Sequence, residues 1–204
     1  MVKDGIYYAI GLTSGGVVIS FLTSPLYAIP LFLLAAFCLY FFRDPDRPVP
    51  SGPLAVSPAD GKVVSIRQDG TDKTRVSIFM NVFDVHVNRS PIAGKISEVR
   101  YQPGQFMAAN KEQASLQNEH NMVTVDAGDT SVTFSQIAGL IARRIVFYKR
   151  AGDQVNIGER VGLIKFGSRV DVYFGQEWQV TVAEGARVSA GSSVLAKRKS
   201  RTSS

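Results

Sequence analysis

A Gly-Ser pair, Gly167-Ser168, interrupts the run Gly162–Asp171, whose β-branched and aromatic residues otherwise predict a strand. Glycine weakens a strand interior, so the pair indicates either a bulge or a backbone position with a special role. Because Gly167 has no Cβ, a strained backbone can bring its carbonyl carbon toward the hydroxyl of Ser168. Attack by that hydroxyl moves the acyl group from nitrogen to oxygen and replaces a stable amide with a labile ester.

An ester at Ser168 opens a route to an electrophilic chain end. Removal of the serine α-proton eliminates the carboxylate of Gly167, and hydrolysis of the resulting dehydroalanine leaves a pyruvoyl group, which carries a ketone. The first step needs a general base near the hydroxyl and donors that stabilise the tetrahedral oxyanion. The pair therefore predicts self-cleavage between residues 167 and 168, with a simple bulge as the structural alternative.

Asp60 and His86 are the candidate acid–base residues. Asp60 lies in Ser57-Pro-Ala-Asp-Gly-Lys62, and His86 lies in Phe83-Asp-Val-His-Val-Asn-Arg-Ser-Pro91. Without further context, Asp60-Gly61 is a turn before a strand, and a single strand histidine is a packed or surface side chain.

The sequence does not predict metal or thiol chemistry. It contains two histidines, His86 and His120, and one cysteine, Cys38, which lies in an apolar run. These residues provide neither a disulfide framework nor a histidine-rich metal site. The net charge of +6 suits an anionic partner such as a membrane surface, and no nucleic-acid-binding motif accompanies it.

Three motifs together carry a family resemblance. Ser57–Lys62, Phe83–Pro91 and Phe166-Gly-Ser-Arg-Val-Asp171, in this order, resemble the phosphatidylserine decarboxylase family. The similarity extends from Val56 onward, and two amino-terminal apolar segments suit the short form of the family. Longer members have Leu-Gly-Ser-Thr at the cleavage site, so this chain keeps the Gly-Ser pair and differs on both sides of it.

The resemblance implies a pyruvoyl-dependent lyase. Ser168 matches the pyruvoyl precursor, and Gly167 would end a large chain, 1–167, that stays associated with a small chain, 168–204. The pyruvoyl group would form a Schiff base with phosphatidylserine and accept the electrons left by carbon dioxide, which yields phosphatidylethanolamine. A homo-oligomer is also implied.

The resemblance assigns further roles. Asp60 matches a residue of the self-cleavage relay, and His86 matches a histidine of the decarboxylation site. The family's second histidine position holds Arg89, which cannot deprotonate and cannot be the general base. Two alternatives stay open: His86 serves both steps, or Asp60 acts directly or through water. Asn118 and His120, in the cluster Asn118–Asn121, are either substrate contacts for the carboxylate or headgroup phosphate, or part of a surface loop.

Two uncharged apolar runs, Ile6–Leu22 and Leu26–Phe42, are each long enough to span a bilayer, and the tight turn between them predicts a helical hairpin. Lys3 before the hairpin and Arg43 after it place both ends in the cytoplasm. We expect a cell-membrane protein with its β domain on the cytoplasmic side. A cleaved signal peptide and a re-entrant hairpin are the alternatives.

The expected organisation is a membrane hairpin at 1–43, a Pro-rich linker at 44–53, a catalytic domain at 54–196 and a basic disordered tail at 197–204. Turn residues separate short alternating runs in the catalytic domain, which predicts a mainly β fold. One short helix is expected at 111–117. The predicted strands are 61–66, 75–80, 95–101, 121–127, 131–137, 143–149, 161–166, 169–174 and 179–182.

A repeated Gly-x-x-Val-x-x-Gly frame begins at Gly152 and again at Gly185. The frame resembles the turns of lipoyl- and biotinyl-carrier domains, which predicts a barrel-sandwich architecture. It also provides an alternative function, a membrane-tethered lipoyl-like adaptor without catalysis. A carrier should present a lysine at a hairpin tip, whereas Lys165 is expected inside a strand.

Overall fold

The structure, a computed structural model, describes residues 1–70, 72–104, 118–139, 144–165 and 168–199. The chain divides into two compact units, residues 1–46 and 47–204. The expected helix at 111–117 lies outside the described residues.

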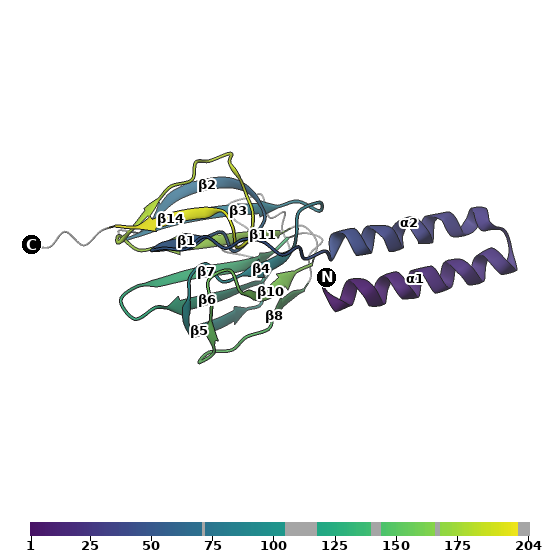
Figure 1. Cartoon of the computed structure of the whole chain (residues 1–204), viewed down its shortest axis with the longest axis horizontal. Helices are drawn as coiled ribbons and strands as arrows, with labels where there is room; N and C mark the ends of the chain where they lie inside the picture. The colour runs from purple at the N-terminus through teal and green to yellow at the C-terminus, as the bar shows by residue number, and fades with distance from the viewer. Residues whose placement is uncertain (71, 105–117, 140–143, 166–167, 200–204) are drawn as a thin grey trace, which may run out of the picture. The chain divides into compact units, whose positions relative to one another are not determined.

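The first unit is a helical hairpin of α1 (Lys3–Leu22) and α2 (Pro25–Phe41), which confirms the prediction (Figure 1). Ser24 caps α2 because its hydroxyl accepts a 3.4 Å hydrogen bond from the amide of Leu26. By length and composition α1 can cross a membrane, whereas α2 is a shorter apolar helix of 17 residues. The expected linker has neither helix nor strand in residues 43–53.

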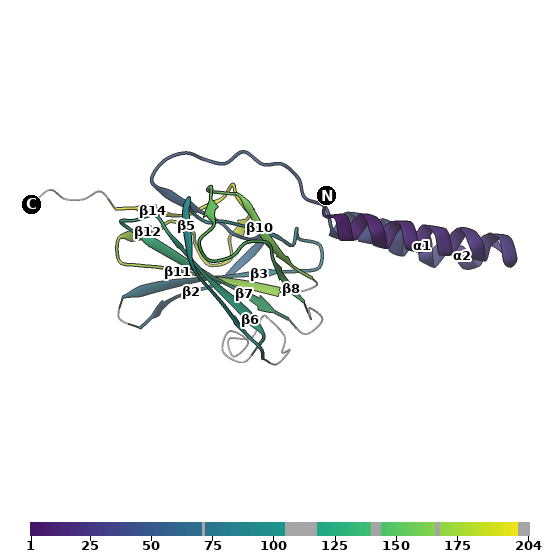
Figure 2. The same ribbon diagram turned by 90° about the horizontal axis from the view of Figure 1, so that it is seen from below.

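The second unit is built from strands (Figures 1 and 2). The main sheet curls into a half-barrel in the order β13-β2-β3-β11-β7-β6-β5-β9, and two three-stranded sheets accompany it, β1-β14-β12 and β4-β10-β8. The strands are β1 (Leu54–Val56), β2 (Gly61–Asp69), β3 (Lys73–Met80), β4 (Val87–Arg89), β5 (Gly94–Gln102), β6 (His120–Asp126), β7 (Ser131–Ala138), β8 (Ile145–Phe147), β9 (Gln154–Val155), β10 (Arg160–Ile164), β11 (Ser168–Phe174), β12 (Trp178–Val180), β13 (Arg187–Val188) and β14 (Val194–Arg198).

Each of the nine predicted runs contains a strand, and the mainly β fold class is confirmed. Two expectations were wrong in detail. Lys165 follows β10 instead of lying inside a strand. The basic tail does not begin at residue 197, because Lys197 pairs with Leu54 and Arg198 pairs with Trp178 in a small sheet.

The repeated glycine frame forms two turns that make corresponding hydrogen bonds. Gly158 and Gly191 both have positive φ, 74° and 78°, which glycine adopts without strain. Their amides donate to the carbonyls of Ser90 and Ser57 at 2.9 and 2.8 Å. The hydroxyl of each serine donates to the carbonyl two residues further on, at 2.7 and 2.6 Å. This internal correspondence supports the barrel-sandwich architecture that the repeat predicted.

The hydrophobic core lies on one face of the main sheet. On β11, Val170, Val172 and Phe174 are fully buried and belong to the core cluster. Side chains alternate between faces along a strand, so Ser168 lies on the same face as these three residues.

Candidate active site

Ser168 is the first residue of β11, which lies between β3 and β7 near the centre of the main sheet. It pairs with Met80 on β3 and with Ala138 on β7. The residue is fully buried, and among the described residues its hydroxyl has no hydrogen-bond partner. Buried polar atoms normally have one, so this hydroxyl is a functional candidate. Gly167 lies outside the described residues.

His86 lies in the loop between β3 and β4 and is 2% exposed. Its carbonyl accepts a 3.2 Å hydrogen bond from the amide of Ile164, the last residue of β10, four positions before Ser168. Its Nδ1 lies 2.9 Å from the carbonyl oxygen of Asp84. Because a carbonyl only accepts, Nδ1 carries the hydrogen, and Nε2 holds the lone pair of the neutral ring.

The loop that carries His86 is fixed by Asp84, which is buried. The Asp84 carboxylate accepts a 2.9 Å hydrogen bond from the amide of Asn81 and forms an ion pair with Arg187. These contacts connect the loop to the end of β3 and to β13. These contacts therefore restrict the conformation of the loop that carries His86.

Asp60 lies directly before β2, is 8% exposed, and forms a two-pronged ion pair with Arg47. Lys62 on β2 and Arg169 on β11 both pair with Phe79, so β2 lies two strands away from β11. With strands spaced about 4.8 Å apart, the two backbones are separated by about 10 Å. The structure places Asp60 at the same end of the sheet as Ser168, with its carboxylate bound elsewhere.

Arg89, which the sequence resemblance matched to a histidine position, contacts a turn. Its Nη1 donates to the carbonyl of Gly158 at 3.2 Å, and its amide donates to the carbonyl of Pro58 at 2.9 Å. The guanidinium thus supports the repeated glycine turn, and these contacts account for an arginine at this position.

Of the two candidate substrate contacts, Asn118 lies near Ser168. Asn118 is 1% exposed, and its Nδ2 donates to the carbonyl of Ala138, the strand partner of Ser168, at 2.7 Å. His120 pairs with Ile137, which pairs with Arg169. Paired residues share a face, so His120 and Ser168 lie on opposite faces of the sheet.

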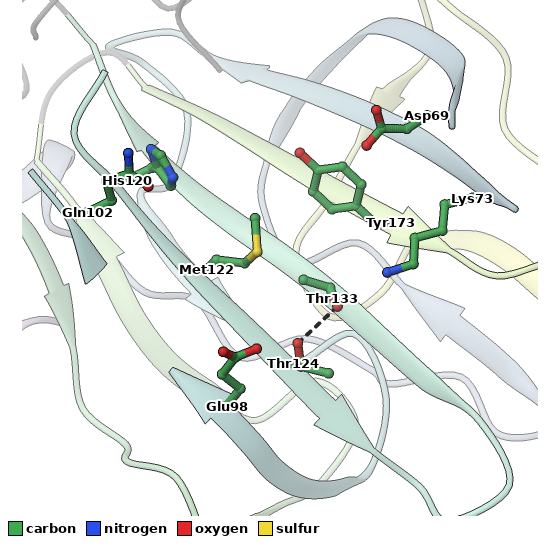
Figure 3. Close-up of a pocket in the computed structure, with 9 residues that line it drawn as sticks. All are labelled: Asp69, Lys73, Glu98, Gln102, His120, Met122, Thr124, Thr133 and Tyr173. Carbon is green, nitrogen blue, oxygen red and sulfur yellow. Dashed lines mark hydrogen bonds between the residues drawn. The ribbon is translucent and has the colours of Figure 1, made fainter. Parts of the chain in front are cut away.

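His120 lines a pocket of about 510 Å³ (Figure 3). By the strand register, this pocket lies on the sheet face opposite Ser168. The Nδ1 atom of His120 lies 2.8 Å from the carbonyl of Asn118. The pocket is polar and contains both charge signs, and burial together with the charge of Asp171 raises the pKa of Tyr173 in its wall to about 12. The lining residues are Asp69, Lys73, Glu98, Gln102, His120, Met122, Thr124, Thr133 and Tyr173.

A buried amide network on the core face was not predicted. Gln136 Nε2 donates to Asn88 Oδ1 at 2.9 Å, and Asn121 Nδ2 donates to Gln136 Oε1 at 3.0 Å. Asn88 Nδ2 lies 4.0 Å from the sulfur of Met80, the strand partner of Ser168. The sequence signal was available, because Asn121 and Gln136 occupy inward positions of alternating strands.

A buried ion pair, which was also not predicted from the sequence, follows the predicted cleavage site. Arg169 Nε donates to Asp171 Oδ1 at 2.6 Å, and its Nη2 donates to the hydroxyl of Ser77 at 2.6 Å. The two charged side chains are 3% and 0% exposed. The ion pair fixes the side chains of the first outward-facing residues of β11 after Ser168.

Comparisons with known proteins identify the family of this chain. The sequence profile of the phosphatidylserine decarboxylase family matches residues 34–196. A phosphatidylserine decarboxylase proenzyme of Solibacter usitatus (strain Ellin6076) is 61% identical over 203 residues, which cover 100% of this chain and 99% of the relative. Proenzymes of the same description from Cupriavidus metallidurans (strain CH34) and Cupriavidus pinatubonensis are 46% and 45% identical, and cover 83% and 84% of this chain and 82% of each relative. The chain therefore belongs to the phosphatidylserine decarboxylase family.

Proposed function

We propose that this chain decarboxylates phosphatidylserine to phosphatidylethanolamine and carbon dioxide, with a pyruvoyl group made from its own Ser168. The observation that carries the proposal is the Ser168 hydroxyl, which is fully buried and has no hydrogen-bond partner within the described part of the chain. The relatives are described as phosphatidylserine decarboxylase proenzymes, which implies processing before activity.

Self-cleavage uses the backbone around Ser168. The hydroxyl attacks the carbonyl of Gly167, the amide C–N bond breaks, and the product is an ester on the Ser168 oxygen with a free amine on Ser168. Loss of the α-proton expels the Gly167 carboxylate, and water then replaces the nitrogen of the dehydroalanine with oxygen and releases ammonia. The products are chains 1–167 and 168–204.

His86 is the proposed general base. Its Nδ1 hydrogen bond to the Asp84 carbonyl assigns the lone pair of the neutral ring to Nε2. Asp60 is a weaker candidate for direct proton transfer, because its carboxylate binds Arg47 and the amide of Ala190. We assign His86 to both self-cleavage and decarboxylation, and Asp60 to a supporting role in self-cleavage.

The pyruvoyl ketone supplies an electrophile for the amine of the lipid and an electron sink for the departing carboxylate. The residues present fit such a group, since Ser168 lies in a buried position with no hydroxyl partner among the described residues. β3 and β7 pair with the whole of β11, so the new chain end would be held at a fixed place. The same pairing would keep the two chains associated after cleavage.

The helical hairpin is the proposed membrane anchor, with the β domain on the cytoplasmic side. Support comes from α1, whose length and composition suit a membrane span, and from Lys3 and Arg43 at the two ends of the hairpin. An anchored domain meets a lipid substrate that stays in the bilayer. The resemblance also implies a homo-oligomer, which light scattering of the purified protein tests.

Incubation of the purified full chain with phosphatidylserine in detergent tests the function. We expect release of carbon dioxide and formation of phosphatidylethanolamine by the wild type, and no release by Ser168→Ala. His86→Ala should lower the rate by about 100-fold or more, the scale of general acid–base catalysis. A lipoyl-like adaptor would release no carbon dioxide in any form.

A further inference from the structure

Arg47 lies in the segment between α2 and β1 and holds Asp60 by two contacts. Arg47 Nη2 donates to Asp60 Oδ2 at 2.7 Å, and Nη1 donates to Oδ1. The two side chains are 16% and 12% exposed, so water screens the pair less than it screens a surface ion pair. A two-pronged guanidinium–carboxylate contact fixes orientation as well as distance.

The backbone of Ala190 completes the contact. Its amide donates to Asp60 Oδ1 at 2.8 Å, and its carbonyl accepts a 3.3 Å hydrogen bond from Arg47 Nη1. Asp60, Arg47 and Ala190 thus form a closed triangle of hydrogen bonds. Arg47, 13 positions before Asp60, and Ala190, 130 positions after it, both contact one carboxylate.

The segment that carries Arg47 has a second attachment at Val49. A methyl group placed on Gly158 would lie 2.7 Å from Cγ2 of Val49, so Val49 packs closely over the glycine turn. Residues 47–49 therefore lie against both copies of the repeated turn, through Ala190 in one and Gly158 in the other.

We propose that Arg47 is a positioning residue for self-cleavage, and that the proenzyme must dock this segment onto Asp60 before it can cleave. The inference rests on the proposed role of Asp60. An aspartate at the same end of the sheet as Ser168 can take part in cleavage only if its carboxylate has a defined orientation, since misplacement of about 1 Å can cost about 100-fold in rate. Arg47 and the Ala190 amide supply that orientation.

Pulse-chase cell-free synthesis of the full chain into nanodiscs measures the rate at which chain 1–167 appears. We expect Arg47→Ala to cleave at least about tenfold more slowly than wild type, on the scale of a positioning effect. Arg47→Lys should be intermediate, because lysine restores the charge without the two-pronged geometry. Arg150→Ala is the matched control, since its side chain is 91% exposed, and should cleave at the wild-type rate.

Two further measurements separate positioning from general damage. Millimolar guanidinium, at levels well below denaturation, should restore part of the cleavage rate of Arg47→Ala and leave wild type unchanged. Once cleaved, Arg47→Ala should decarboxylate phosphatidylserine at the wild-type rate per pyruvoyl group.

Cleavage of Arg47→Ala within twofold of wild type would overturn the inference. So would slow cleavage that guanidinium does not restore, because that result indicates a structural defect. Failure of wild type itself to cleave would instead overturn the proposed function.

Discussion

Ser168 pairs with Ala138 across β11 and β7, and the carbonyl of Ala138 accepts a 2.7 Å hydrogen bond from the side chain of Asn118. Asn118 thus reaches the site through a backbone group, one strand away from the serine. This geometry favours a positioning role for Asn118 over the direct substrate contact that the sequence suggested.

Asn118→Ala removes a buried donor and leaves the Ala138 carbonyl without this bond. We expect a loss of about 1–2 kcal/mol in the free energy of unfolding and slower appearance of the two chains. Urea unfolding in the uncleavable Ser168→Ala background measures the first, and a pulse-chase measures the second. Gln179→Ala, at an exposed strand position, is the control. Unchanged stability and cleavage rate would contradict the positioning role.

Removal of one partner of the Arg169–Asp171 ion pair should lower the free energy of unfolding. Asp171→Ala leaves a buried guanidinium without its carboxylate, and we expect a loss of about 3–5 kcal/mol. The double variant Arg169→Met with Asp171→Leu should be more stable than the single one, because it buries no unpaired charge. Thermal melting in the Ser168→Ala background compares them. A double variant less stable than Asp171→Ala would refute this explanation.

Gly61 begins β2 directly after Asp60 and has φ of 141°. A Cβ at this position would lie 2.1 Å from the carbonyl oxygen of Phe79. Gly61→Ala should therefore force β2 away from β3, lower the free energy of unfolding by about 3 kcal/mol or more, and slow self-cleavage. Gly70→Ala, also at positive φ but in open space among the described residues, should cost about 1 kcal/mol. Equal effects of the two variants would be evidence against the predicted clash.

Tyr173 should make stability fall at alkaline pH. Its pKa is raised to about 12 from the ordinary 10, chiefly by burial and then by the charge of Asp171. The folded protein then holds this proton more tightly than the unfolded chain, so the stabilisation is full below pH 10 and is lost as pH rises toward 12. Urea midpoints across this range should fall less steeply in Tyr173→Phe than in wild type.

Local sequence patterns predicted nine of the strands, and the structure confirms them. Four of the strands that the sequence did not predict, β1, β4, β9 and β13, have only two or three residues, too few to show such a pattern, whereas β14 lies partly in the segment that was expected to be a disordered tail. Alternating runs such as 131–137 identified the long strands, whereas β9 and β13 have only two residues each. Their position depends on pairing with β5 and β2, which sequence periodicity does not record.

Candidate site residues could be named from the sequence where a motif marks a single residue. Ser168, His86 and Asp60 stood out by motif, but their contacts come from remote parts of the chain. Arg47 and Ala190, which both contact Asp60, are separated from it by 13 and 130 positions in the sequence. Gln136 is separated by 48 positions from its hydrogen-bond partner Asn88. The face occupied by His120 followed only from the register of three paired strands.

The mass of the mature chains tests the central claim most directly. Intact mass spectrometry of the purified wild type should detect chains 1–167 and 168–204, and the small chain should begin with a ketone that reacts with hydroxylamine. Ser168→Ala should give one chain of full mass that does not react. A wild-type protein of full mass, with an ordinary amide between residues 167 and 168, would contradict the account.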